Sequence, residues 1–489
     1  MRIRSLKVKD FFILKDFKID FNDNLSVLIG ENGSGKSTII ELLADIFGHI
    51  HKFFILGDKT AGFVEHYEII YDYIKGNQSY TIEIHSCQYV DNRSCTFAPK
   101  IWINGEELSL PQIEKRYGGM ETFLPTKIIL EYAGISEHLR LLSQHFEEKY
   151  KAEIIKADNK YTLSPELNLP KSRPFIYIKP EHLSMLVLSL FVSDADLDVN
   201  FIREYLGIDK ESCQIDLVFK KPSWAKKTEE KWWGISGNVA LQFFQTIEVF
   251  ADEIETKEKE DVLIYRFIGS TNLEVAFEDL RAHNKELVFT ILDTLLYDEL
   301  LSKIKISWEL DEDEYMDLSR LSEGQKQIIL TQGTNLVFGK EEKNLLFLYD
   351  EPDVFLHPKW QKQFVSNIRA GLDPTSMAII TSHSPSIVSD LRTPNLHLIR
   401  KGKVVNKALQ HYGKTVESIL KDYFGLENTR SNDVSKKIDT LWGLIEKGNF
   451  EEKVFAAKMK ELISIIGHED PEILAMHRDI LRMKHEKAK

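Results

Sequence analysis

The chain of 489 residues contains only three cysteines, Cys87, Cys95 and Cys213, and no Cys-x-x-Cys pair. Three thiols cannot form a disulfide framework, and the missing pair excludes a zinc knuckle or hook. His85 stands close to two of the thiols, but a fourth metal ligand is missing, so we interpret these residues as strand and loop positions. Cysteine usage therefore favours reduced thiols in the cytosol.

The sequence also lacks a long hydrophobic run and a secretory leader. Its longest apolar stretch, residues 183–192, is about half of the ~20 residues that a bilayer requires. The first residues carry basic side chains but pass directly into a strand-like pattern, without an apolar segment or a small-residue cleavage site. We expect a cytoplasmic protein without a membrane partner.

Sustained heptads, internal repeats and an excess of basic residues are missing as well. A long coiled-coil arm is therefore not expected. The 63 Lys and Arg against 76 Asp and Glu give a formal net charge of −13, which excludes nucleic-acid binding over the whole surface but allows a local basic patch. A hydrophobic content of 43% is typical of folded chains, and the length predicts two or three structural units.

The first informative motif is the glycine-rich segment 30–37, Gly-Glu-Asn-Gly-Ser-Gly-Lys-Ser, between an apolar strand and a helix expected over residues 37–47. It fits the phosphate loop G-x-x-x-x-G-K-[ST] in its required context. Backbone N–H groups and the helix N-terminus are suited to phosphates. Lys36 is predicted to reach the β- and γ-phosphates, and Ser37 to bind Mg²⁺. The predicted ATP-contacting residues are Gly30, Asn32, Gly33, Ser34, Gly35, Lys36, Ser37 and Thr38.

A second apolar strand, residues 345–349, ends in Asp350 and Glu351. In a parallel sheet this end lies at the same edge as the phosphate loop. Asp350 is therefore a predicted Mg²⁺ ligand. Glu351 is the predicted catalytic residue that polarises the attacking water.

The segment 321–325, Leu-Ser-Glu-Gly-Gln, precedes a helix expected over residues 326–336. It resembles the LSGGQ signature of ABC ATPases, although a plain serine N-cap would also explain it. Its position about 25 residues before the Asp-Glu strand favours the signature. The resemblance implies that Ser322, Gly324 and Gln325 contact the γ-phosphate held by a second copy, so that two heads close on MgATP.

The next apolar strand ends in His383, which is similar to the switch histidine of ABC ATPases that senses the γ-phosphate. A lone histidine is usually structural, but its position one helix-and-strand unit after Glu351 favours a catalytic role. Between them, residues 352–358 resemble the D-loop that crosses the dimer interface, with Asp353 and His357 as candidates for coupling the two sites. The glutamine loop remains open among Gln88, Gln112 and Gln144.

The gap between phosphate loop and signature is nearly three times that of a transporter subunit. This gap and the sequences of the motifs resemble those of the group of RecF, structural-maintenance-of-chromosomes (SMC) and overcoming-lysogenization-defect proteins. The resemblance covers residues 1–150 and 310–405. The implied fold class is α/β. It consists of an ABC-ATPase head, a parallel phosphate-loop sheet with an antiparallel β layer, carrying a mixed helical insertion and a helical C-terminal tail.

Four segments are expected on this basis: an N-terminal head lobe at 1–150, a mixed α/β insertion at 151–305, a C-terminal head lobe at 306–410, and a helical region at 411–489. Within the insertion, helices are predicted near residues 180–206 and 272–303. Residues 220–227 with Trp232 and Trp233 interleave basic and aromatic side chains, as nucleic-acid contacts do. A solvated loop with a packed tryptophan pair is the favoured interpretation.

The tail lacks the strand-borne carboxylates of a Toprim nuclease. Instead, residues 465–472, Ile-Ile-Gly-His-Glu-Asp-Pro-Glu, and the basic helix after them resemble the ATPase subunit of bacterial Septu anti-phage systems, also found beside some retrons. The resemblance implies a homodimeric or higher-order ATPase that regulates a separate small HNH endonuclease, with DNA as a further candidate partner. The alternative is a RecF- or SMC-like ATPase of DNA repair or maintenance that acts without a nuclease.

Overall fold

A computed structural model describes the chain apart from residues 59–63, 65, 87, 92–93, 98, 133–136, 157–172, 194, 209, 226–230, 235–237, 279–284, 312–313, 341, 392–394, 406–410, 427 and 488–489. Cys87 and the side chain of Cys95 lie outside the described part, so the interpretation of these thiols stays a prediction. The chain divides into two compact units, Met1–Gly413 and Lys414–Lys489. Among the described residues, no helix is both long and apolar enough to span a membrane.

A seven-stranded sheet forms the centre of the first unit, in the order β11-β10-β17-β18-β3-β19-β20. All of its strands run parallel except the last. The strands at its centre are buried along both faces, which explains their unbroken apolar sequences. The strands are β3 (Leu25–Ile29), β10 (Ile128–Tyr132), β11 (Phe175–Tyr177), β17 (Leu346–Asp350), β18 (Met377–Ser382), β19 (Leu396–Arg400) and β20 (Lys403–Val404).

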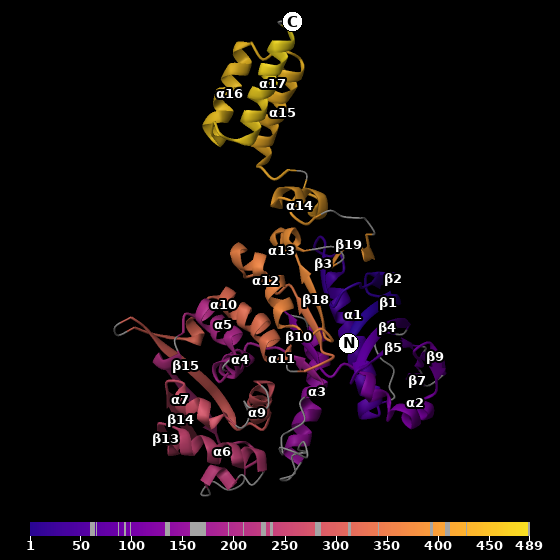
Figure 1. Cartoon of the computed structure of the whole chain (residues 1–489), viewed down its shortest axis with the longest axis vertical. Helices are drawn as coiled ribbons and strands as arrows, with labels where there is room; N and C mark the ends of the chain where they lie inside the picture. Colours follow the sequence, from indigo (N-terminus) through magenta and orange to yellow (C-terminus); the bar gives the residue numbers. More distant parts are fainter. Residues whose placement is uncertain are drawn as a thin grey trace. The chain divides into compact units, whose positions relative to one another are not determined.

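A six-stranded antiparallel sheet packs against α1 (Lys36–Leu56) and shares one hydrophobic core with that helix. In Figure 1 it is the indigo and purple layer at the right. Its strands are β1 (Arg2–Phe11), β2 (Leu14–Asp20), β4 (Tyr67–Lys75), β5 (Gln78–His85), β8 (Lys100–Ile103) and β9 (Glu106–Leu108). The predicted combination of a parallel phosphate-loop sheet with an antiparallel β layer is therefore confirmed.

The insertion, together with the residues that follow it up to Asp317, contains a second antiparallel sheet, in the order β13-β14-β12-β15-β16, which lies at the lower left of Figure 1. Its strands are β12 (Cys213–Lys220), β13 (Glu253–Lys257), β14 (Val262–Ile268), β15 (Leu301–Asp311) and β16 (Glu314–Asp317). Its helices are α4 (His182–Phe191), α5 (Asp196–Leu206), α6 (Asn238–Phe250), α7 (Thr271–Ala276) and α9 (Lys285–Tyr297). The mixed α/β character expected for the insertion is present.

Three predicted helices differ from the observed ones. The helix after the phosphate loop continues nine residues beyond the predicted end at 47, because its apolar stripe continues until Gly57, whose positive φ ends it. The helix predicted over 180–206 is broken near Ser193, whose hydroxyl donates to Asp198 at the start of α5. The helix predicted over 272–303 is also not continuous: its described residues form α7 and α9, followed by β15, and Glu299 adopts a positive φ that ends α9.

The tryptophans of the insertion are packed, as the favoured interpretation predicts. The indole N–H of Trp224 donates to the carbonyl oxygen of Asp298 over 2.9 Å, and that of Trp232 donates to the Tyr265 hydroxyl over 2.9 Å. The neighbouring Lys226 and Lys227 lie outside the described residues. The described tryptophan contacts are therefore those of a folded core.

The second unit consists of α14 (Val416–Phe424), α15 (Asn432–Glu446), α16 (Lys453–Ile466) and α17 (Pro471–Lys487). The last three helices bury a core of their own, with Leu441, Leu462 and Met476 fully inside. A bidentate pair between Arg430 and Asp470 joins the segment before α15 to the start of α17. The helical character predicted for the tail is observed.

We expect Leu462→Ala to destabilise this helical bundle by about 2–5 kcal/mol, because the substitution leaves a cavity in a fully buried core. Calorimetry of the whole chain should show a lower transition temperature for the bundle, while the affinity for ATP stays unchanged. Val454→Ala, at an exposed position on the same helix, is the matched control and should leave both unchanged. Equal transitions for Leu462→Ala and the unmodified chain would contradict the prediction.

Candidate nucleotide site

The carboxyl ends of three neighbouring parallel strands carry the residues predicted to bind and hydrolyse ATP. β3 leads into the phosphate loop, β17 ends at Asp350, and β18 is followed directly by His383. They border a cavity of about 330 Å³. It is lined by Asn32, Gly33, Ser34, Gly35, Lys36, Ser37, Thr38, Glu351 and His383. Residues predicted from separate motifs thus meet in one place.

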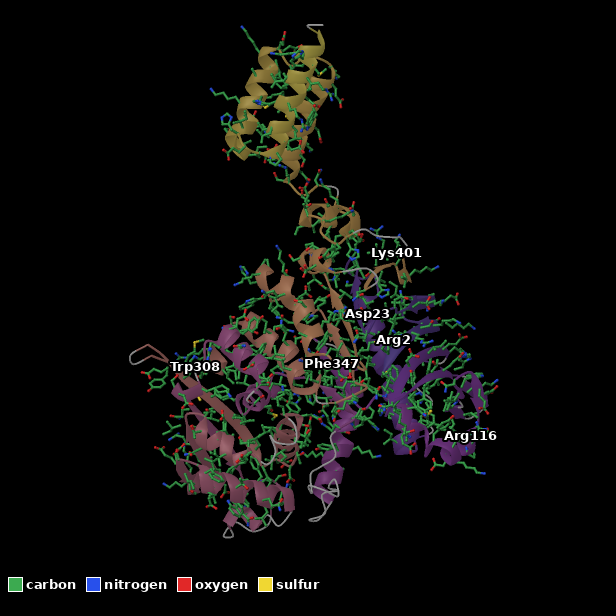
Figure 2. All side chains as sticks on the ribbon, viewed as in Figure 1. Arg2, Asp23, Arg116, Trp308, Phe347 and Lys401 are labelled. Atoms are coloured by element: carbon green, nitrogen blue, oxygen red, sulfur yellow. The ribbon has the colours of Figure 1, made fainter. Side chains whose placement is uncertain are left out.

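The backbone of the phosphate loop explains its glycines. A Cβ atom at Gly30 would lie 2.2 Å from the carbonyl oxygen of Ile399, so a side chain there would displace the neighbouring strand β19. Gly35 has a φ of 106°, which residues with a side chain rarely adopt. The N–H of Gly402 donates to the carbonyl oxygen of Ser34 over 2.8 Å. The β19–β20 turn, where Lys401 is labelled in Figure 2, thereby supports the loop from outside.

The ammonium group of Lys36 is the centre of the site. It donates to the carbonyl oxygens of Gly30 and Glu31 at 3.2 and 3.3 Å, and it lies 2.7 Å from Nε2 of His383. The same histidine nitrogen is 3.1 Å from a carboxylate oxygen of Glu351. All three predicted catalytic side chains are therefore in direct contact.

Burial controls the protonation of this group of side chains. It lowers the pKa of Lys36, against the opposing charges of Glu351 and Asp350. It also lowers the pKa of His383, and the Lys36 charge acts in the same direction. A neutral imidazole can accept a hydrogen bond from the Lys36 ammonium group. The Glu351 carboxylate, next to the same imidazole nitrogen, opposes these effects and raises the pKa of His383.

Asp350 and Ser37 fit the requirements of a magnesium site. One carboxylate oxygen of Asp350 accepts from the Thr381 hydroxyl, and Ser37 also hydrogen-bonds this carboxylate. The second oxygen, Oδ2, is buried and has no hydrogen-bond partner among the described groups. Burial raises the pKa of Asp350 to about 6. A hydroxyl and an unpartnered carboxylate oxygen are ligands that Mg²⁺ prefers, with phosphate oxygens completing the coordination.

Glu351 has an unusual backbone conformation, with a φ of 52°. Its N–H donates to the Thr381 hydroxyl over 2.8 Å, which holds the turn after β17 in place. Non-glycine residues with positive φ cost energy and are concentrated at functional sites. The conformation directs the Glu351 side chain to the cavity, whereas the preceding Asp350 points into the buried edge.

The signature residues lie elsewhere on the first unit. Ser322 caps α10 (Glu323–Ile328). Its hydroxyl oxygen accepts from the N–H of Gln325, and its own N–H donates to the side-chain oxygen of Gln325. A Cβ atom at Gly324 would lie 2.7 Å from the carbonyl oxygen of Phe355, in the loop after β17. None of the three predicted signature residues, Ser322, Gly324 and Gln325, lines the cavity of the same chain.

The helix after the signature differs from its prediction. It begins at Glu323 and not at residue 326, and it is interrupted by a π-helical turn, Ile329–Gly333, before α11 (Thr334–Phe338). π-helical turns occur frequently at functional sites. In this turn Thr331 and Gln332 are buried polar residues, and the Gln332 side chain accepts from the amide of Asn367 over 3.1 Å.

Sequence reasoning missed Glu131, a buried carboxyl group on β10 next to the Asp350 strand. Its Oε1 atom accepts from the side-chain amide of Gln327 on α10 over 2.6 Å, and its Oε2 atom has no hydrogen-bond partner among the described groups. Burial raises the pKa of Glu131 to about 8, and the charges of Asp350 and Asp353 add to this effect. A glutamate inside the apolar run Ile-Ile-Leu-Glu was the available signal.

Of the candidate glutamines, Gln112 and Gln144 do not line the cavity. Gln112 bonds Ser109 at the start of α2 (Leu110–Tyr117), and Gln144 bonds Glu148 on α3 (Glu137–Lys156). Gln88 begins β6 (Gln88–Asp91), and its side chain is not described. The glutamine loop therefore remains unassigned.

A further feature of the cavity mouth is the tip of the β1–β2 hairpin. Phe12 and Ile13 are both exposed there, and Phe12 has a φ of 51°. Ile13 lies close to Gly35 of the phosphate loop and to Gly402 of the β19–β20 turn. These apolar side chains provide a surface beside the phosphate-binding groups that is suited to a flat base.

The fold and the site define an ATPase with a phosphate loop. The family model described as AAA ATPase domain matches residues 1–388, and the chain belongs to this family. The expectation of an ATPase with a phosphate loop is thereby confirmed at the level of the family.

Similar curated proteins match only a part of this chain. The Septu protein PtuA of Bacillus thuringiensis is 33% identical over 123 residues, which cover 24% of this chain and 31% of PtuA. The DNA repair protein RecN of Rickettsia typhi is 29% identical over 119 residues, which cover 24% of this chain and 18% of RecN. The chain therefore spans less than a third of the length of these relatives.

Solved structures with a related fold include the SMC head domain from Thermotoga maritima, 13% identical with a TM-score of 0.31, covering 84% of this chain and all of that domain. The recombination mediator protein RecF with ATP is also 13% identical, with a TM-score of 0.31, and the match covers 83% of this chain and 98% of RecF. The strand order of the central sheet defines the fold of the first unit.

Glu131→Gln should stabilise the nucleotide-free protein by an amount that grows with pH. The pKa of Glu131 is raised from 4.5 to about 8, so between these values the folded chain keeps a proton that the unfolded chain releases. Stability due to this group falls as pH rises through that window, by at most about 1.4 kcal/mol per pH unit. Urea unfolding of the variant and of the unmodified chain at pH 5.5 and pH 8 measures the effect. A difference in free energy of unfolding between the two proteins that is the same at both pH values would contradict the prediction.

Proposed function

We propose that the chain binds MgATP in the cavity between β3, β17 and β18 and hydrolyses it slowly, using the cycle to change the contact between two heads. The observation that supports this best is the convergence of Lys36, His383 and Glu351 on one cavity. A cationic lysine for phosphate and a carboxylate that can orient water are groups that phosphoryl transfer to water uses, and His383 contacts both.

Each group has a distinct role in this proposal. Lys36 binds the β- and γ-phosphates, and Glu351 orients and polarises the attacking water. His383 leaves its contact with Lys36 when the γ-phosphate enters and then contacts that phosphate. Mg²⁺, held by Ser37 and Asp350, would neutralise charge on the phosphate oxygens.

We propose further that the complete site needs a second copy of the chain. Ser322, Gly324 and Gln325 do not line the cavity of their own chain, but their sequence resembles the LSGGQ signature of ABC ATPases. Next to Gly324, the loop after Glu351 presents the exposed apolar side chains of Val354 and Phe355. A homodimer with two sandwiched ATP molecules would cover these side chains and bring each signature to the opposite γ-phosphate.

The proposed output is control of a partner HNH endonuclease in anti-phage defence. It rests on the partial similarity to the Septu protein PtuA and on the tail segment 465–472. Two ATP molecules that each favour the closed state by a few kcal/mol can shift a two-state equilibrium almost completely.

A second candidate is an ATPase of DNA repair or maintenance that acts without a nuclease. The partial similarity to RecN favours it. In this case the closed heads would act on DNA directly. The two candidates share the ATP cycle and differ in the macromolecule that the closed dimer binds.

Glu351→Gln should lower kcat for ATP hydrolysis by about 10² or more, because it removes the acceptor for the water proton, and should accumulate the ATP-bound dimer. Lys36→Ala and Ser37→Ala should abolish nucleotide binding. Phosphate release and light scattering with ATP are the measurements. Glu309→Gln, at an exposed position on β15, is the control for a lost carboxylate; hydrolysis at the unmodified rate by Glu351→Gln would refute the assigned water-polarising role.

The partner is tested by capture of tagged Glu351→Gln protein from the native lysate with MgATP, followed by mass spectrometry and a nucleic-acid stain. We expect a small HNH protein in a fixed ratio to the ATPase. The Lys36→Ala protein, which cannot close on ATP, is the control and should recover less of it. DNA or repair proteins without a nuclease would favour the second candidate.

A further inference from the structure

The carboxyl group of Glu131 lowers the stability of the fold at its buried position. Its carboxyl group is 2% exposed, and the group that donates to it, the Gln327 amide, is neutral. Two other buried carboxyl groups, Asp350 and Asp353, are near enough to raise its pKa. An apolar side chain or an amide would avoid this cost, because a buried carboxyl group without a compensating charge lowers stability. A buried group that costs stability near a reactive site indicates a functional constraint.

The contact partner of Glu131 lies on the helix that carries the signature. Gln327 follows Gly324 by about one helical turn, and the hydroxyl of Thr331 in the π-helical turn donates to the Gln327 carbonyl oxygen over 2.9 Å. The Gln327 amide also reaches the Thr331 hydroxyl at 3.3 Å. Gln327 is thereby held in one orientation, with its amide directed at Glu131.

On its other side, Glu131 belongs to the strand beside the catalytic one. In the parallel pairing of β10 and β17, Glu131 lies opposite Tyr349 and Tyr132 lies opposite Asp350. The Glu131–Gln327 hydrogen bond therefore joins the strand edge that carries the predicted Mg²⁺ ligand to the helix that presents the signature. The second contact of this helix, Gly324 against the backbone of Phe355, leads to the same strand edge.

We infer that Glu131 is a positioning residue, which sets the orientation of the signature helix relative to the ATP-binding edge through its hydrogen bond to Gln327. This inference rests on the proposed function, in which the signature of one head acts on ATP held by the other. A shift of the signature by about 1 Å is enough to slow a positioned reaction strongly. ATP binding to a single head, by contrast, does not require the signature.

The test compares Glu131→Leu, Gln327→Leu, the double variant and Glu131→Gln in the full chain. Glu131→Leu and Gln327→Leu each remove the hydrogen bond and should lower kcat about tenfold, while the affinity of the single head for ATP stays within about twofold. The double variant should be no slower than either single variant, because both remove the same contact. Glu131→Gln keeps an acceptor for the Gln327 amide and should retain kcat within about threefold of the unmodified chain.

Glu342→Leu is the matched control. Glu342 is a partly buried carboxyl group, 20% exposed, and it contacts Lys127, before the first residue of β10, at the opposite end of the same strands. This variant should lower Tm and leave kcat unchanged below the transition, which separates a loss of stability from a loss of positioning. Unchanged kcat in Glu131→Leu, additive losses in the double variant, or an equal loss of kcat in Glu342→Leu would overturn the inference. If the unmodified chain fails to hydrolyse ATP, the proposed function itself is wrong.

Discussion

The parallel hydrogen bonding of β3, β18 and β17 is the constraint on which the nucleotide site depends. Ile29 pairs with Ser382, and Tyr349 pairs with Ile380, so the residues that follow these strands emerge at one edge of the sheet. The phosphate loop, the Asp-Glu pair and His383 come from distant parts of the chain and meet for this reason. A change of register by one residue would turn the side chains of a strand to the opposite face.

The edge formed in this way gathers carboxyl groups, of which Glu351 and Asp350 act on the charge of Lys36. Asp350, Asp353 and Glu131 are buried, and burial raises the pKa of each, while it lowers the pKa of Lys36. Such an edge fits a divalent cation bound together with an anionic nucleotide, because each supplies the charge that the other lacks. Stability is reduced locally where the chemistry requires charged groups in a low-dielectric environment.

The parts of the site that could be predicted are those that follow from local patterns. A glycine loop after an apolar strand, and a strand that ends in two carboxylates, have their meaning within a few residues. The long predicted helices failed for a related reason. The hydroxyl of Ser193 bonds Asp198 at the start of α5, and Glu299 adopts a positive φ after α9. Both features leave the apolar periodicity on either side almost unchanged. Glu131 was missed because its significance comes from neighbours on two other elements.

The sequence by itself determined which chemical groups the protein has for ATP, the order in which they occur, and the family to which the chain belongs. Only the tertiary structure decided that Lys36, His383 and Glu351 are in contact, that Asp350 has an unpartnered oxygen, and that the signature lies away from its own cavity. The physical reason is distance. Periodicity and composition act over a few residues, whereas hydrogen bonds and burial depend on how close the fold brings residues that are remote in the chain.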